Sequence, residues 1–349
     1  MKTDTIAFVS YLHRAVAREN LTAADAQAVM DAILDGQAST PLIAALLVAL
    51  RMKGETPDEL LGFARSMRAR AIPVQAAVPG EPLVDTCGTG GDGACTFNVS
   101  TVAALVVAGA CVKVAKHGNR SISSQCGSAD ILEGLGVRID LTPEEISRCI
   151  REVGFGFLFA PAIHPAMRNA QPARRELKLR TAFNLLGPLT NPAGATAQLV
   201  GAPSVRTAEL IAEALASLGL SRGYVVHGLD GLDEISTTSE TFVLEIRGGA
   251  IAHRTFTPEE FGLRRADPSD LKGSDREENC AIARAILSGE RGPKRDIVLL
   301  NAGAALAISG RAPDVQNGIE LAAQSVDSGA AARKLEDLAR FTGAPAVNR

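Results

Sequence analysis

The sequence predicts an α/β protein with a small all-helical N-terminal domain and a large α/β domain that has a central, mainly parallel sheet. Up to about residue 70, apolar residues recur at helical spacing, whereas from about residue 82 short apolar runs alternate with amphipathic stretches. The chain has 349 residues and 46% hydrophobic content, which is enough to bury a large core. The predicted domains are residues 1–73 and 74–349.

Helix-start signals support the prediction for the N-terminal domain. A threonine-proline pair begins at Thr40, and Thr56 is followed three positions on by Glu59. The second pattern is a capping box, in which the two side chains satisfy each other's backbone N–H groups at the start of a helix. The stretch AIPVQAAVPGEP at residues 71–82 is rich in proline and alanine, and we expect a linker there.

The α/β domain is predicted from five short apolar runs of strand length. They are PLVDTC, VKVAKHG, FLFAPA, AQLVGAP and GYVVHG. Helical stretches lie between them, among them a capping box at Thr142–Glu145 and the amphipathic run TAELIAEALASLG. Strands that alternate with helices form a parallel sheet covered on its faces. A later run, TFVLEIRGGAIAHRTF, has Gly248 and Gly249 between two alternating halves, which indicates a β-hairpin.

Composition and charge exclude several classes of protein. The formal net charge is −3 and no basic run is long enough to form an arm, so we expect no nucleic acid partner. The six cysteines form no C-x-x-C pair and have no histidine at zinc spacing, which indicates reduced thiols in the cytoplasm. The longest apolar run, LIAALLVAL, is far shorter than the ~20 residues that span a bilayer, so we expect no membrane segment.

A glycine-rich loop follows the first predicted strand, in VDTCGTGGDGACTFNVST. Gly88, Gly90 and Gly93 match G-x-G-x-x-G, the pattern of dinucleotide-binding turns. Such turns need an acidic residue about 20 positions further on. Here the next carboxylate after Asp92 is Asp130, and the second strand runs into the cationic KHGN. The match is therefore weak support for a nicotinamide cofactor.

The same loop suits a phosphate group. Glycines let backbone N–H groups approach an anion closely, and NVST opens the next predicted helix with its positive dipole end. The alternative is an ordinary strand-to-helix turn in which Ser100 or Thr101 caps the helix. The residues of other loops in the domain are needed to distinguish the two interpretations.

Two further loops carry charged and hydroxyl side chains at predicted strand ends. One is KHGNRSISSQCGSAD, and the other is VHGLDGLDEIS, which contains Asp230, Asp233 and Glu234. Parallel sheets bind ligands at the carboxyl ends of their strands, so we expect these loops and the glycine loop to face one cleft. Cations and hydroxyls suit phosphate oxygens, and clustered carboxylates suit Mg²⁺. The alternatives are solvated lysines, turn-capping serines, a packed histidine at His117 and a solvated acidic turn.

In these stretches the chain resembles the anthranilate phosphoribosyltransferase family. The matching runs are GTGGDGACTFNVST, KHGNRSISSQCGSAD, HPAMRNAQPARRELKLRTAFNLLGPLTNPAG and VHGLDGLDEIS, in family order over nearly the whole length. The resemblance implies a fold like that of nucleoside phosphorylases and phosphoribosyltransferases. It implies transfer of the 5-phosphoribosyl group from 5-phosphoribosyl 1-diphosphate to the amine of anthranilate, in tryptophan biosynthesis. The segment near 168–190 is then expected to return to the helical domain and close the cleft.

The resemblance also implies the site residues, position by position. Those expected to contact phosphoribosyl diphosphate are Gly88, Gly91, Asp92, Thr96, Asn98, Val99, Ser100, Thr101, Lys116, His117, Gly118, Asn119, Arg120, Ser121, Ile122, Ser123, Ser124 and Ser128. Those expected to contact anthranilate are Gly88, Asn119 and Arg174. Those expected to hold metal are Ser100, Asp233 and Glu234. No residue is assigned as catalytic nucleophile, acid or base, because the departure of diphosphate requires none.

The implied cofactor is Mg²⁺, two ions per subunit, and the implied assembly is a cytoplasmic homodimer. The chain departs from the family pattern at Lys178, where glycine is frequent, and at Gln125 and Cys126. Two other classes remain open. A pyrimidine-nucleoside phosphorylase would not need the pair Asp233 and Glu234, and a nucleic-acid-binding relative is disfavoured by the acidic net charge.

Overall fold

One mainly parallel sheet organises the structure, a computed structural model that describes residues 2–121 and 125–343. Its seven strands lie in the order β3-β2-β1-β4-β5-β6-β7. The strands are β1 (Leu83–Gly88), β2 (Lys113–Gly118), β3 (Phe155–Phe159), β4 (Ala197–Gly201), β5 (Arg222–Gly228), β6 (Thr241–Arg247) and β7 (Ala250–Phe256). The first five pair in parallel and the last two pair antiparallel. The five predicted strands and the predicted hairpin are confirmed.

A large apolar core covers one face of the sheet. The helices on this side are α5 (Val99–Gly109), α6 (Ser128–Gly134), α11 (Arg276–Leu287), α12 (Pro293–Ser309), α13 (Val315–Asp327) and α14 (Ala330–Thr342). Alternate residues of a strand point to opposite faces, and Leu199 and Val226 point into this core. In α5 the seven residues 102–108 are all buried, so this helix lies inside the core rather than on its surface.

The opposite face packs on two smaller cores. Val200 and Val225 point to this side, where α10 (Val205–Ser217) continues the core into the helical domain. The helix α7 (Pro143–Glu152) covers β3, with Ile146 and Ile150 buried. Its predicted capping box at Thr142 and Glu145 is confirmed, since each side chain binds the other's backbone N–H.

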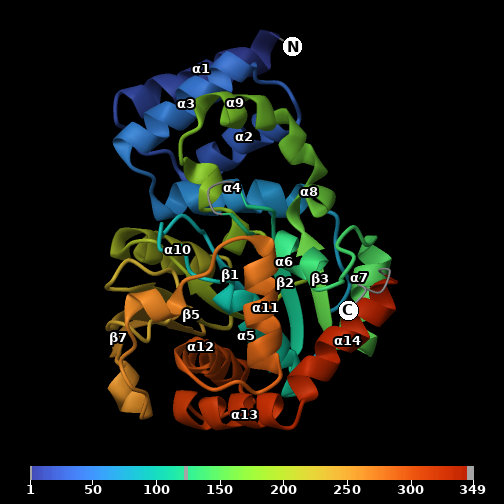
Figure 1. Cartoon of the computed structure of the whole chain (residues 1–349). Helices are drawn as coiled ribbons and strands as arrows, with labels where there is room; N and C mark the ends of the chain where they lie inside the picture. Colours follow the sequence, from blue (N-terminus) through green and yellow to red (C-terminus); the bar gives the residue numbers. More distant parts are fainter. Residues whose placement is uncertain (1, 122–124, 344–349) are drawn as a thin grey trace.

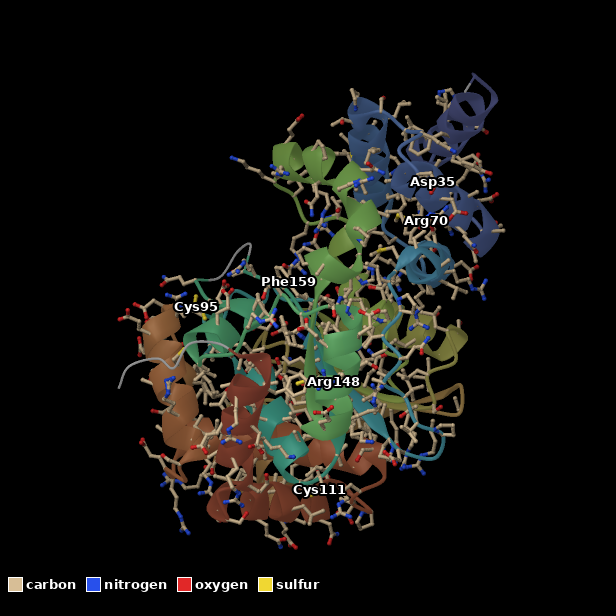
Figure 2. All side chains as sticks on the ribbon, turned by 90° about the vertical axis from the view of Figure 1, so that its right-hand side faces the viewer. Asp35, Arg70, Cys95, Cys111, Arg148 and Phe159 are labelled. Carbon is tan, nitrogen blue, oxygen red and sulfur yellow. The ribbon has the colours of Figure 1, made fainter. Side chains whose placement is uncertain are left out.

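The N-terminal helices form a bundle at one end of the molecule (Figure 1). They are α1 (Lys2–Val16), α2 (Ala23–Leu34), α3 (Thr40–Lys53) and α4 (Pro57–Arg70). The capping box of α4 at Thr56 is confirmed, whereas the N-cap of α3 is Ser39, one residue before the predicted start signal. Arg70 bonds both carboxylate oxygens of Asp35, each at 2.8 Å, which joins the ends of α4 and α2 (Figure 2).

The segment 71–82 that links the bundle to β1 has no helix or strand, as predicted, but it is fixed to the α/β domain. Val74 is buried, and its N–H donates to the carbonyl of Pro192 at 3.3 Å. The hydroxyl of Ser147 and the guanidinium of Arg151 both donate to the carbonyl of Gln75. This stretch is therefore a packed connection rather than a loose tether.

Between β3 and β4 the chain leaves the sheet and enters the helical bundle. Phe159, the last residue of β3, lies where the chain turns toward the bundle (Figure 2). The short helices of this excursion are α8 (Ala160–Ile163), η1 (Pro165–Asn169), α9 (Gln171–Leu177), η2 (Ala182–Asn184) and η3 (Gly187–Leu189). The helix α9 contacts α3, and it lies among the N-terminal helices in Figure 1. The segment that contains α9 therefore packs on the helical bundle.

Two further short helices, η4 (Pro258–Phe261) and η5 (Pro268–Leu271), follow the hairpin. Within the described part of the chain, no helix has the length and apolar character needed to cross a bilayer.

Lys178 ends α9 in a left-handed backbone conformation, with φ 49° and ψ 30°. A side chain with a Cβ atom costs about 1 kcal/mol or more in this region, whereas glycine enters it freely. The glycine that the resemblance implies at this position would adopt the same conformation without strain.

Replacing Lys178 by glycine should raise the free energy of unfolding by about 0.5–1 kcal/mol, because the relief of strain outweighs the extra chain entropy of glycine. Urea unfolding followed by circular dichroism measures the change. Lys178→Ala keeps the Cβ atom and is the control, which should show no such gain. Equal stability of the glycine and alanine variants would contradict the strain at this turn.

Candidate active site

The loop after β1 depends on backbone conformations that favour glycine. Gly90, Gly91 and Gly93 have φ values of 63°, 80° and 73°, and Cys95 adopts φ 54°. Gly88 has no such φ, but a Cβ atom there would lie 2.8 Å from a carboxylate oxygen of Asp233. The glycines therefore serve two needs, since three turn the loop and one lets an acidic side chain approach.

The two acidic residues after β5 reach this loop. Asp233 accepts a hydrogen bond from the N–H of Gly90 at 3.1 Å, through Oδ2. Glu234 accepts one from the N–H of Ser100 in the first turn of α5, also at 3.1 Å, through Oε1. These bonds join residues more than 130 positions apart. The predicted meeting of the first and third loops at the carboxyl ends of the strands is confirmed.

Both carboxylates are costly to keep charged in the folded protein. Burial, followed by the nearby Asp92, raises the pKa of Asp233 to about 7. Burial, followed by Asp233, raises the pKa of Glu234 to about 8. A cation at this point would remove the repulsion and favour the charged forms.

The donor set fits a magnesium ion that is shared with a phosphate ligand. Across residues 2–121 and 125–343, no three histidine, cysteine, aspartate or glutamate side chains are grouped to hold a metal by themselves. Magnesium is commonly held by one or two carboxylates together with substrate phosphates and water. Asp233 and Glu234 supply the carboxylates. Ser100 adds a hydroxyl next to them, because its backbone N–H donates to Glu234.

Lys116 lies beneath the loop rather than at its surface, with 1% of its area exposed. Its ammonium group donates to the carbonyl of Thr86 and, at 3.3 Å, to the hydroxyl of Ser100. Burial lowers the pKa of Lys116, while attraction to Asp85 and Glu234 opposes that shift. The predicted contact of Lys116 with the donor stays a prediction, and the geometry favours an action through Ser100.

Other predicted donor-binding residues of the first loop also take part in internal contacts. The side chain of Asn98 donates to the carbonyl of Cys126 at 3.0 Å and accepts from Asn279 at 3.2 Å. The backbone of Thr96 forms an isolated bridge with Lys272. Val99 is buried, and the hydroxyl of Thr101 is buried with no hydrogen-bond partner among residues 2–121 and 125–343. For these four residues the roles in binding stay predictions.

The loop after β2 is organised by Ser128 and Asp130. The hydroxyl of Ser128 accepts from the N–H of Asn119 at 3.2 Å, and Asp130 accepts from the N–H of Ser121 at 3.1 Å. The guanidinium of Arg120 pairs with Asp130 and Glu133. A Cβ atom on Gly118 would lie 2.3 Å from the Ser128 hydroxyl, so the glycine permits this packing. The predicted contacts of Ile122, Ser123 and Ser124 lie outside the described residues.

Arg174, the predicted anthranilate contact on α9, carries a guanidinium that is largely removed from water. It lies over the ring of Phe183, with 5.3 Å between Cζ and the ring centroid. Burial lowers the pKa of Arg174. No hydrogen bond or ion pair of its side chain occurs within the described residues. A desolvated guanidinium without an anion is suited to bind a carboxylate.

Two buried histidines lie side by side near the junction of the domains. The ring centroids of His117 and His164 are 5.2 Å apart. Nδ1 of His117 is 2.9 Å from the carbonyl of Gly187, and Nε2 of each ring is buried without a hydrogen-bond partner in the described part of the chain. Burial lowers the pKa of His117, and burial with His117 nearby lowers the pKa of His164 to about 3. The interpretation of His117 as a packed residue is supported, and His164 was not singled out from the sequence.

Sequence reasoning also missed Asp85 and Arg180. Asp85 is fully buried in β1 and accepts from the N–H of His117 at 3.1 Å and from the amide of Asn191 at 2.8 Å. Arg180 follows α9 and reaches the carbonyl of Thr89 at 3.4 Å. Both side chains form hydrogen bonds with residues that are distant in the sequence, and no local sequence pattern predicts such bonds.

A separate cavity lies at the other end of the sheet. Its volume is about 390 Å³, and its lining includes Arg222, Tyr224, Arg254 and Phe261. Arg222 is the first residue of β5, whereas the acidic loop follows the last residue of that strand. The cavity is therefore distinct from the site at the carboxyl ends of the strands.

Comparison with known proteins identifies the class of enzyme. Residues 9–71 match the helical bundle domain of the glycosyl transferase family, and residues 80–332 match its a/b domain. Together with the carboxylates and glycines at the strand ends, these matches define a glycosyltransferase with a helical domain above a mainly parallel sheet.

Individual relatives narrow the class further. Anthranilate phosphoribosyltransferase of Solibacter usitatus is 58% identical over 336 residues, covering 96% of this chain and 99% of the relative. The Moorella thermoacetica enzyme of the same name is 56% identical, and the match covers 93% of this chain and 95% of that enzyme. The crystal structure of the Thermus thermophilus enzyme is 47% identical with a TM-score of 0.90, covering 96% and 99%. The Saccharomyces cerevisiae enzyme in complex with PRPP and Mg is 28% identical with a TM-score of 0.89, covering 96% and 98%.

The chain belongs to the anthranilate phosphoribosyltransferase family. The predicted fold class and the resemblance to this family are confirmed.

The buried His164 should make stability depend on pH. A folded-state pKa of about 3, below the 6.5 of an ordinary histidine, means that the unfolded chain binds the proton first as the pH falls. The stabilisation is present above pH 6.5 and is lost toward pH 3, by about 2 kcal/mol at pH 5. The free energy of unfolding, measured in urea, should therefore fall between pH 7 and pH 5, and His164→Asn should remove this part of the fall. His253→Asn on the exposed strand β7 is the control, and an unchanged slope in the first variant would contradict the prediction.

Proposed function

We propose that this enzyme transfers the 5-phosphoribosyl group of 5-phosphoribosyl 1-diphosphate to the amine of anthranilate. The products are N-(5-phosphoribosyl)anthranilate and diphosphate, as in tryptophan biosynthesis. The observation that carries the proposal is the binding of Asp233 to Gly90 and of Glu234 to Ser100. This arrangement places two carboxylates beside a glycine loop and a helix start. The relatives that match nearly the whole chain carry this activity in their names.

On the donor side, we propose that the glycine loop and the first turn of α5 bind the diphosphate and the ribose phosphate. Backbone N–H groups at a glycine loop and a helix start favour anions. The residues proposed for this role are those predicted from the sequence, of which Gly88, Asp92 and Ser100 adjoin the two carboxylates. Lys116 would act from below by orienting the Ser100 hydroxyl.

Asp233 and Glu234, with the hydroxyl of Ser100, would hold magnesium, for which we propose two ions per subunit. When bound, magnesium would neutralise the negative charge of the departing diphosphate. The raised pKa values of both carboxyls support this role, because a cation is what would bring them to the charged form at neutral pH.

In the reaction, the bond between ribose C1 and the diphosphate oxygen breaks, and its electron pair leaves with the diphosphate. The lone pair of the anthranilate nitrogen forms the new bond at C1 from the opposite face, and the nitrogen then loses a proton. No side chain is assigned as nucleophile or general base. The chain's contribution is to position both substrates and to stabilise the leaving group with N–H donors.

On the acceptor side, we propose that Arg174 binds the carboxylate of anthranilate, with Asn119 and Gly88 nearby. The support is the unpaired, desolvated guanidinium over Phe183. We also propose that the enzyme is a homodimer that acts in the cytoplasm. The sequence supports a reducing compartment, because its six cysteines show neither a C-x-x-C pair nor the pattern of a disulfide scaffold.

The direct test mixes purified protein with anthranilate, phosphoribosyl diphosphate and magnesium, and follows the product by chromatography and the loss of anthranilate fluorescence. We expect turnover only when all three components are present. Phosphorolysis of thymidine or uridine without magnesium would instead identify a pyrimidine-nucleoside phosphorylase. Tight, salt-sensitive DNA binding with no turnover would identify a nucleic-acid-binding relative.

The double variant Asp233→Asn, Glu234→Gln should lose at least about 10³-fold in kcat/KM, because it removes the charges proposed to hold magnesium. Its free energy of unfolding at pH 8 should be equal or higher, since neutral amides remove the cost of two buried charges. Steady-state kinetics and urea unfolding measure the two effects. Turnover like that of the wild type would remove the metal assignment.

Arg174→Ala should raise the KM for anthranilate by about 30- to 150-fold, equivalent to about 2–3 kcal/mol for a charge-assisted contact. The KM for phosphoribosyl diphosphate should change little. Arg175→Ala is the matched control, because Arg175 is the exposed neighbour on the same helix. A larger effect at Arg175 would shift the acceptor contact by one residue, and no effect at either would place the acceptor elsewhere.

A further inference from the structure

The return segment brings one more guanidinium to the glycine loop. A Cβ atom built on Gly91 would lie 1.6 Å from Nη1 of Arg180 and 2.5 Å from its Cζ. The guanidinium therefore fills the space directly over Gly91. Its one hydrogen bond within the described residues is a long one, from Nη2 to the carbonyl of Thr89 at 3.4 Å. Most of the five N–H groups of this side chain are left for another acceptor.

The charges around Arg180 are only partly balanced. Burial lowers the pKa of Arg180, while Asp233 and Asp92 act in the opposite direction. Neither carboxylate comes within the 4 Å of an ion pair in the described structure. Arg51 of α3 adds a second positive charge that repels Arg180. A guanidinium that lies over the glycine loop, forms no ion pair within the described residues and is repelled by a second cation is a place for an anion.

We infer that Arg180 is a further donor-binding residue, whose guanidinium binds the diphosphate of the phosphoribosyl donor over Gly91. This inference rests on the proposed function. A planar guanidinium can bind two phosphate oxygens at once, and the negative charge of the diphosphate would offset the repulsion of Arg180 by Arg51.

The place of Arg180 in the chain gives this contact a second effect. Arg174 and Arg180 lie on either side of the left-handed turn at Lys178, six positions apart. A diphosphate that holds Arg180 would fix the end of this turn, and with it the helix that carries Arg174. Donor binding would then improve the placement of the acceptor arginine, which is a coupling between the two substrate sites.

Isothermal titration of the full chain with magnesium and inorganic pyrophosphate tests the contact without turnover. We expect Arg180→Gln to weaken pyrophosphate binding at least about 10-fold and Arg180→Lys to weaken it less, because lysine keeps the charge but not the fork. Arg175→Gln is the matched control on the same segment and should bind as the wild type does. Equal binding by Arg180→Gln and the wild type would overturn the inference.

The coupling is tested by titrating anthranilate with and without magnesium pyrophosphate. In the wild type, pyrophosphate should tighten anthranilate binding several-fold, and in Arg180→Gln this difference should disappear. A merely structural role would weaken anthranilate binding equally under both conditions and would overturn the coupling. If the wild type binds no pyrophosphate at all, the proposed function itself fails, which is distinct from a failure at Arg180 alone.

Discussion

The balance of buried charge around Lys116 is the interaction on which the rest of the site depends. This ammonium group lies below the glycine loop, where Asp85 and Glu234 offset the cost of removing it from water. Its donors hold the carbonyl of Thr86 and the hydroxyl of Ser100, so the end of β1 and the start of α5 stay together. Because Glu234 also accepts from the Ser100 N–H, two strands, the loop after β5 and one helix are joined at a single point.

Close packing makes this arrangement possible. A Cβ atom on Gly201 would lie 1.6 Å from the carbonyl of Asp233, and one on Gly88 would meet the carboxylate of the same residue. The acidic loop can therefore fold over the ends of β1 and β4 only because both strands end in glycine. Gly88 and Gly201 are needed because a side chain there would have no space, whereas the glycines inside the loop are needed for their positive φ values.

Local sequence patterns predicted much of the fold, since apolar runs and capping boxes consist of residues that are close together in the sequence. The strands, the hairpin at Gly248 and the capped helices are of this kind. The pairing of Asp233 with Gly90 could be expected from the rule that strand ends share one edge. Arg180 and His164 could not, because their positions depend on how an excursion of the chain packs on a distant domain. The cap at Ser39 differs from the prediction by one residue, since serine and threonine stand next to each other there.

The chain passes through the helical bundle twice, because α9 joins α3 long after the first four helices have ended. The bundle is therefore not a module that can be cut off or exchanged at a single peptide bond. A chimera with the helices of another family member would have to exchange two separate stretches of sequence together. The two stretches must also change together during evolution, since each one forms part of the surface that the other packs on.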